Sequence, residues 1–218
     1  MEDIALDVGH TLSTPGATSA RGRSEYAFNR ELAGRLVAAA EALGMRLRPI
    51  NFEGDIASLP ERARQAEGSR ILLSIHHDSI SENFLLPWDW NGSAQSYTDV
   101  KRGFGLFVSR RNPALERSLA CASRIGEALR GAGFVPTPWH ARKHPPADAE
   151  NGVWYYDNLI VLHQARGPAV LFEAGVIKHR EEELALRDPE QQAAMAEALI
   201  AALRGCPGVR ERPVPASD

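Results

Sequence analysis

The sequence predicts an α/β fold, a single three-layer αβα domain with helices on both faces of a mostly parallel central sheet. Short apolar runs typical of buried strands alternate along the chain with segments whose apolar residues recur at helical spacing. This alternation implies parallel strands joined by right-handed crossovers. The length of 218 residues suits one domain of this kind and can bury a large core.

Strand, helix, strand, helix and strand follow one another in the first third of the chain. The expected strands are 4–10, 45–50 and 70–78, and the expected helices are 25–43 and 58–67. Ser24 is a good N-cap for the first helix, and Gly44 suits the position after its end. In the second helix, Ser58 can cap and Pro60 is accepted in the first turn.

The rest of the chain adds further strands and helices and two long loops. The expected strands are 104–109 and 168–176, the expected helices are 113–130, 181–186 and 189–203, and 159–162 is a short apolar run. Residues 79–103 are expected to be irregular, and Trp88 and Trp90 there either form a wall or lid of a substrate site or pack on the body. Residues 136–152 form a polar, proline-rich loop. The segment 205–218 is expected to be a disordered tail.

The composition excludes several classes of partner. The chain is 44% hydrophobic and 24% charged, with a net charge of −3 and an isoelectric point near 6.2. This balance provides no field that would attract nucleic acid or an anionic membrane, and no basic run stands out. No stretch approaches the roughly 20 apolar residues that a membrane span needs. No signal peptide is visible, so the chain is expected to be cytoplasmic, exported by another route, or cut from a longer precursor.

The two cysteines give little information in the sequence. Cys121 and Cys206 lie far apart, and neither has the spacing of a metal ligand. We expect both to be free thiols, with Cys121 acting as a small apolar residue within its helix.

Ligand-type side chains stand at the ends of several core elements. His10 closes the first strand, and Glu25 lies in the first turn of the long helix. His76 and His77 follow the apolar part of the third strand, and Glu173 ends another strongly apolar strand. The carboxyl ends of parallel strands lie at one edge of a sheet, where ligands bind. These side chains can therefore converge on one site.

Two histidines and one glutamate are a ligand set of zinc hydrolases, which keep a fourth position open. A nearby carboxylate such as Glu173 can then accept the proton of the attacking water. His76 and His77 cannot both face one metal if the strand continues through them, and spacing does not choose between them. Each residue also has a structural interpretation: His10 could close a turn, Glu25 could be an ordinary first-turn acid, and Glu173 could pair with an arginine.

Four segments of the chain resemble the zinc-dependent N-acetylmuramoyl-L-alanine amidases of the amidase type 3 family. They are residues 6–10 with 15–17, Glu25 with Asn29 and 32–33, residues 74–76, and residues 168–175 with 181–183. Together they span roughly residues 4 to 203 in order. Each motif is modest, but the ordered set is specific.

The resemblance implies that His10, Glu25 and His76 bind one Zn²⁺ ion, which favours His76 over His77, and that Glu173 is catalytic. The implied reaction is hydrolysis of the amide between the lactyl group of N-acetylmuramic acid and L-alanine of the stem peptide. The implied partner is peptidoglycan or a muropeptide, and the implied location is the cell envelope, either periplasmic or extracellular. Residues 1–204 would be the zinc amidase catalytic domain, and a monomer is expected.

The chain departs from the family pattern in three places. Residues 11–14 replace the glycine-rich continuation that is common after the first histidine. Ala174 and Val176 stand where a leucine and an aromatic residue are more usual. Residues 79–103 do not resemble the long regulatory helix of some relatives, which argues against gating by an activator.

Further site residues and other functions are also considered. Asn29, His140, Asp157 and Asn158 are candidates for substrate contact or for support of the ligands, with a purely structural role as the alternative for each. His163 and His179 are assigned to structure or surface. Two other functions fit the pattern: a zinc peptidase of related architecture, and a catalytically silent domain that binds peptidoglycan.

Overall fold

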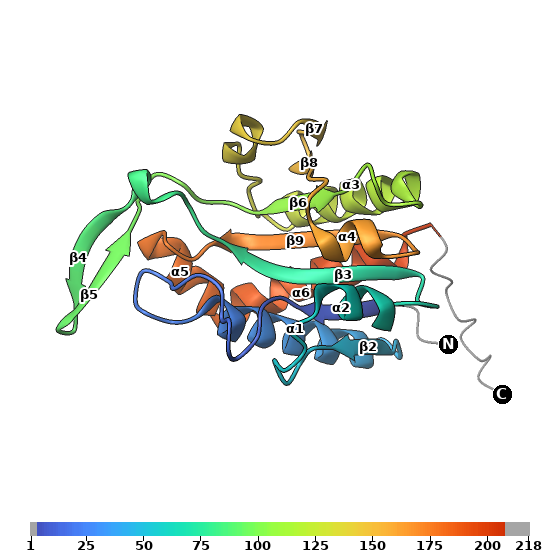
Figure 1. Cartoon of the computed structure of the whole chain (residues 1–218), viewed down its shortest axis with the longest axis horizontal. Helices are drawn as coiled ribbons and strands as arrows, with labels where there is room; N and C mark the ends of the chain where they lie inside the picture. The colour runs from blue at the N-terminus through green and yellow to red at the C-terminus, as the bar shows by residue number, and fades with distance from the viewer. Residues whose placement is uncertain (1–3, 208–218) are drawn as a thin grey trace.

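A seven-stranded sheet forms the centre of the fold (Figure 1), as seen in a computed structural model that describes residues 4–207. Its strands are β1 (Ile4–Val8), β2 (Leu47–Ile50), β3 (Ile71–Asp78), β6 (Gly105–Val108), β7 (Pro146–Asp148), β8 (Val153–Tyr155) and β9 (Ala169–Val176). They lie in the order β2-β1-β3-β9-β6-β8-β7. The pairs β1–β2, β1–β3, β3–β9 and β6–β8 are parallel, whereas β6–β9 and β7–β8 are antiparallel. The predicted mostly parallel sheet is confirmed.

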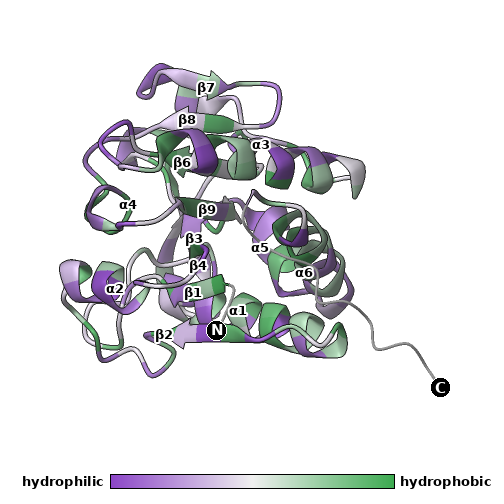
Figure 2. Cartoon of the chain, turned by 90° about the vertical axis from the view of Figure 1, so that its right-hand side faces the viewer, coloured by the Kyte–Doolittle hydropathy of each residue, from purple (hydrophilic) through white to green (hydrophobic). Residues whose placement is uncertain are grey.

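Helices cover both faces of this sheet (Figure 2). One face carries α1 (Glu25–Ala42), α3 (Leu115–Gly131), α5 (Arg180–Arg187) and α6 (Pro189–Arg204), and the other carries α2 (Leu59–Gln65) and α4 (Ile160–Gln164). Successive strand residues point to opposite faces. Leu73 accordingly packs in the core with α1 and α6, while Leu72 packs in the core with α4. Within the described part of the chain, every helix is too short or too polar to span a lipid bilayer.

The sequence analysis expected the segment 79–103 to be irregular, and this expectation is wrong. The segment holds a short 3-10 helix (Glu82–Phe84) and a hairpin of β4 (Leu86–Trp90) and β5 (Ser93–Tyr97), which projects from the body in Figure 1. The two-residue turn, Asn91–Gly92, has positive φ at both positions, the conformation that suits a tight hairpin. Trp88 stacks on Trp90 and donates a hydrogen bond of 2.8 Å to the carbonyl of Ala20. The tryptophans therefore pack on the neighbouring loop.

The proline-rich segment 136–152 is also more ordered than expected. It contains a second 3-10 helix (Trp139–Arg142) and the edge strand β7. The strand β8 follows directly after it, so this segment completes the sheet edge beyond β6.

The two cysteines are not free thiols, which corrects the sequence analysis. Cys121 in α3 and Cys206 beyond the end of α6 form a disulfide, with their Cα atoms 5.0 Å apart. They are separated by 85 positions, and the packing of α3 against α6 brings them together. The expected tail also begins too early at residue 205, because Cys206 is buried in the core. The remainder of that tail, 208–218, lies outside the described residues.

The disulfide leads to a prediction about stability. Replacement of Cys206 by serine should lower the free energy of unfolding by about 2–4 kcal/mol, because the bridge restricts the unfolded chain. Urea unfolding followed by circular dichroism measures this difference. Wild-type protein with reductant should behave like the variant. Two thiols titrating in unfolded protein that was never reduced would contradict the bridge.

Candidate metal centre

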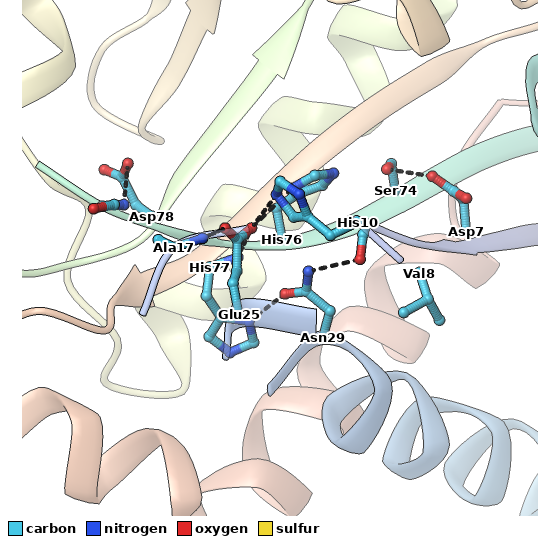
Figure 3. A network of polar contacts seen from close by, with 12 residues as sticks. Asp7, Val8, His10, Ala17, Glu25, Asn29, Ser74, His76, His77 and Asp78 are labelled. Atoms are coloured by element: carbon cyan, nitrogen blue, oxygen red, sulfur yellow. Dashed lines mark hydrogen bonds and ion pairs between the residues drawn. The ribbon is translucent and has the colours of Figure 1, made fainter. Parts of the chain in front are cut away.

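Three ligand-type side chains meet at the carboxyl edge of the sheet. His10 follows β1, Glu25 is the first residue of α1, and His76 lies near the end of β3. One oxygen of Glu25, Oε1, lies 2.9 Å from His10 Nε2 and 3.1 Å from His76 Nδ1. The three potential ligand atoms all lie within 4.8 Å of one another, and in Figure 3 dashed lines join the carboxylate of Glu25 to the two rings. The convergence expected from strand topology is therefore present.

The backbone at His10 is held in an unusual conformation. Its φ of 67° lies in the left-handed region, which is uncommon for residues other than glycine. The carbonyl of His10 accepts hydrogen bonds of 2.6 Å from Asn51 Nδ2 and 2.7 Å from Arg62 Nη2. Gly9 is needed beside it, because a Cβ there would lie 2.3 Å from His76 Nε2. These contacts aim the imidazole of His10 at Glu25.

A buried charge pair supports this turn from below. Arg62 Nη1 lies 3.8 Å from Asp7 Oδ1, and Ser74 donates a hydrogen bond of 2.7 Å to Asp7 Oδ2. Burial raises the pKa of Asp7, while Arg62 and Ser74 act in the opposite direction. Arg62 also donates to the carbonyl of Val8 at 3.2 Å. Helix α2 thus supplies no ligand but fixes the end of β1.

The carboxylate of Glu25 is nearly inaccessible to solvent, with only 5% of the residue exposed. Burial would raise its pKa, but the hydrogen bonds with His10 and His76 outweigh burial and hold the pKa of Glu25 well below its usual range. Its other oxygen, Oε2, accepts a hydrogen bond of 3.1 Å from the backbone N–H of Ala17. A Cβ at Gly16 would lie 2.5 Å from Oε2, so the loop before α1 can approach only with glycine there.

His76 and His77 face different surroundings, as strand alternation requires. The His77 ring is buried, and its Nδ1 lies 2.7 Å from Asn29 Oδ1. Asn29 in turn donates a hydrogen bond of 3.1 Å to the carbonyl of Gly9. Burial lowers the pKa of His77 to about 3, so this ring is neutral at neutral pH. His77 and Asn29 therefore brace the site, and only His76 joins His10 and Glu25.

The three donor atoms fit a zinc ion. Zinc binds imidazole nitrogen and carboxylate oxygen at about 2.0–2.2 Å, so ligand atoms at the corners of a tetrahedron stand roughly 3.3 Å apart. The spacings from Glu25 Oε1 to His10 and to His76, 2.9 and 3.1 Å, are close to this value. The nitrogens of the two imidazole rings lie within 4.8 Å of each other, which leaves room for an ion between the three donor atoms.

Glu173 lies beside this cluster on the neighbouring strand. It pairs in register with His76 across β3 and β9. Its Oε2 is buried and has no hydrogen-bond partner among the described residues. Burial, with the charges of Asp78 and Glu25, raises the pKa of Glu173 well above its ordinary value. An orphaned carboxylate oxygen with this tendency to hold a proton can accept a proton and return it.

A cavity of about 300 Å³ opens next to Glu173 on the side of β6. It is lined by residues from four segments of the chain: Asp78, Ser79, Ile80, Ser81, Lys101, Phe107, Thr137, Trp139, His140, Lys143, His144, Tyr156, Glu173 and Val176. His140 Nε2 lies 3.5 Å from Asp78 Oδ2. The His140 ring packs over Gly105, where a Cβ would approach Nε2 to 2.6 Å. Burial raises the pKa of Asp78 to about 7 and lowers that of His140 to about 4.

The weaker candidates from the sequence fall in different places. His140 lines the cavity, and Asn29 braces His77. Asp157 accepts hydrogen bonds from Arg110 and does not line the cavity, and neither does the exposed Asn158. The sequence analysis gave no role to Asp78 or Lys101. The sequence offered a reason to consider Asp78, because it follows His77 directly at the end of the strand. It offered none for Lys101, which lies in a segment that was expected to be irregular.

Comparisons with known proteins agree with this geometry. A family model described as N-acetylmuramoyl-L-alanine amidase matches residues 4–205. No curated protein sequence gives a significant match.

Several solved structures share the fold. The N-acetylmuramyl-L-alanine amidase Ami1 from Mycobacterium smegmatis has a TM-score of 0.74 at 21% identity, over 94% of this chain and 95% of that one. The amidase from Clostridium difficile 630 has a TM-score of 0.71 at 17% identity, over 93% and 94% of the two chains. The catalytic domain of CwlV from Bacillus (Paenibacillus) polymyxa var. colistinus has a TM-score of 0.71 at 20% identity, over 94% and 97%. With the family match over nearly the whole described chain, this protein belongs to the N-acetylmuramoyl-L-alanine amidase family.

Proposed function

We propose that this protein is a zinc-dependent hydrolase that cleaves the amide between the lactyl group of N-acetylmuramic acid and L-alanine of the peptidoglycan stem peptide. One observation carries the proposal: ligand atoms of His10, Glu25 and His76 lie within 4.8 Å of one another, beside a carboxylate oxygen of Glu173 that has no partner in the described chain. Membership of the amidase family supports the substrate class.

His10, Glu25 and His76 would hold one Zn²⁺ ion. When bound, zinc supplies a Lewis acid that polarises the amide carbonyl and activates a water molecule. Within this ligand set, Glu25 would supply the single negative charge and the two histidines would be neutral donors.

Glu173 would move the protons of the reaction. It accepts a proton from the attacking water and then gives it to the nitrogen of the departing L-alanine, which leaves as an amine. The unpartnered Oε2 of Glu173 is available for both hydrogen bonds. The raised pKa of Glu173 suits a group that must be protonated and deprotonated within one turnover.

The proposed substrate places the protein in the cell envelope, either periplasmic or extracellular. The disulfide between Cys121 and Cys206 supports an oxidising location. We further propose that the catalytic domain extends past residue 204 to include the buried Cys206, and that the protein works as a monomer on peptidoglycan or muropeptides.

The metal site can be tested by removing ligands. His10→Ala and His76→Ala should lower the zinc content measured by elemental analysis from about one ion per chain to a small fraction of that value, because three ligands hold the ion. His163→Ala is the matched control, since this ring contacts the Asp157 backbone and lies outside the cluster. Unchanged zinc content in both ligand variants would refute the assignment. Chelator should abolish hydrolysis of purified sacculi, and added zinc should restore it.

The role of Glu173 predicts a separation of binding from turnover. Glu173→Gln keeps the shape of the protonated acid and should retain zinc, but it should lower kcat on the order of a hundred- to ten-thousandfold. Mass spectrometry of products from a muramoyl-peptide measures the loss. Undiminished release of the peptide would contradict the role. A plain peptide of the same sequence, tested alongside, distinguishes an amidase from a peptidase.

A further inference from the structure

Lys101 presents a positive charge that forms no ion pair within the described residues, and the acid acting on it is Asp78, beyond ion-pair distance. Only 8% of this lysine is exposed. Its Nζ lies 3.4 Å from the ring centroid of Phe84 and 4.6 Å from that of Trp139. Within residues 4–207, no carboxylate lies within 4.0 Å of Nζ and no oxygen accepts a hydrogen bond from it. The aromatic rings attract the charge but leave the three N–H donors of the ammonium unsatisfied.

This ammonium belongs to the same cavity as Glu173. Lys101 and Glu173 both line the cavity of about 300 Å³, which is at the lower end of the size of small-molecule pockets. Strand topology explains their proximity. Gly105 at the start of β6 pairs in register with Glu173, and β6 runs antiparallel to β9. The segment that enters β6, including Lys101, therefore crosses the sheet edge at which β9 ends.

Charges of both signs line the cavity. The acids are Asp78 and Glu173 and the cations are Lys101 and Lys143, and Asp78 attracts the charge of Lys101 from beyond ion-pair distance. The two lining histidines add no charge at neutral pH, because burial lowers the pKa of both His140 and His144. The guanidinium of Arg142 lies 6.0 Å from the Trp139 ring and adds positive charge near Lys101. The ammonium of Lys101, which forms no ion pair, therefore suits an anionic group on a ligand that also reaches Glu173.

The proposed reaction indicates which part of the substrate enters this cavity. Glu173 must reach the leaving nitrogen, so the departing peptide lies on the Glu173 side of the metal centre and the sugar lies on the other side. The cavity continues from Glu173 away from His10 and Glu25, neither of which lines it. The departing peptide is therefore the part that meets Lys101.

We propose that Lys101 binds a carboxylate of the departing stem peptide and thereby selects acidic stem peptides over amidated ones. This inference rests on the proposed amidase function, because that function decides which end of the substrate occupies the cavity. The rings of Phe84 and Trp139 hold the ammonium in place, so that little side-chain freedom is lost when the carboxylate binds.

The test uses two muramoyl-peptides that differ in one group, a free α-carboxylate or a carboxamide on the second residue of the stem. Wild-type protein should prefer the acid in kcat/KM by about tenfold or more, the usual effect of one charged hydrogen bond. Lys101→Met fills the same space between the rings without charge, and it should bring the ratio close to one. Lys101→Arg should keep a preference for the acid. A ratio that is unchanged in Lys101→Met would overturn the proposal.

Two controls separate this contact from other effects. Lys143 also lines the cavity but is exposed, so Lys143→Met should change the ratio by about twofold or less because solvent screens its charge. If the acid-to-carboxamide ratio of kcat/KM falls as far in Lys143→Met as in Lys101→Met, the preference comes from the general positive charge of the cavity. That result would overturn the specific contact with Lys101. Equal melting temperatures and zinc contents in all variants exclude misfolding as the cause.

A binding measurement distinguishes failure of this proposal from failure of the proposed function. Calorimetry with the free acidic peptide and its carboxamide, on protein without substrate, needs no hydrolysis. Acid-selective binding that Lys101→Met abolishes supports the site even if muramoyl-peptide is not cleaved. Hydrolysis of both substrates without any acid preference, and equal binding of the two peptides, would retain the amidase function and reject the role of Lys101.

Discussion

The carboxylate of Glu25 is the interaction on which the site depends. Burial opposes ionisation of an acid, yet the two imidazoles of His10 and His76 hold its pKa low, and the Ala17 N–H binds its second oxygen. One side chain thus ties together the end of β1, the start of α1 and the end of β3. The loop before α1 must return closely to the sheet edge, and glycine at position 16 permits that approach.

Buried polar groups behind the ligand residues keep this arrangement from relaxing. The left-handed backbone at His10 is disfavoured by itself, and the hydrogen bonds from Asn51 and Arg62 compensate for it. Arg62 is in turn placed by Asp7, a carboxylate that is fully inaccessible to solvent. Removing one partner of a buried pair leaves an uncompensated charge. The position of a candidate zinc ligand therefore depends on α2, which lies on the opposite face of the sheet from α1 (Figure 2).

The same sheet edge also explains the cavity. Because β6 is antiparallel to β9, β6 begins at the sheet edge at which β9 ends. The two 3-10 helices belong to the segments that follow β3 and precede β7. These short helices bring Phe84 and Trp139 together with ring centroids 6.2 Å apart. Lys101 lies against both rings. Catalysis and selection of the departing peptide would then use neighbouring parts of one surface, the metal centre on β1 and β3 and the cation beyond β9.

Periodicity, caps and turn residues are local properties of the sequence, and they were enough to predict the strands β1, β2, β3, β6 and β9 and the longer helices. Parallel topology, which brings the ends of distant strands to one edge, also predicted that His10, Glu25 and Glu173 would meet His76 or His77, and the family resemblance favoured His76. The Asn91–Gly92 dipeptide is a local signal for a hairpin turn, and it could have predicted the hairpin in a segment that was expected to be irregular. The Cys121–Cys206 bridge and the surroundings of Lys101, in contrast, could be recognised only in the folded structure. Both arise from contacts between segments that are far apart in the chain, and such contacts leave no periodic trace in the sequence around either partner.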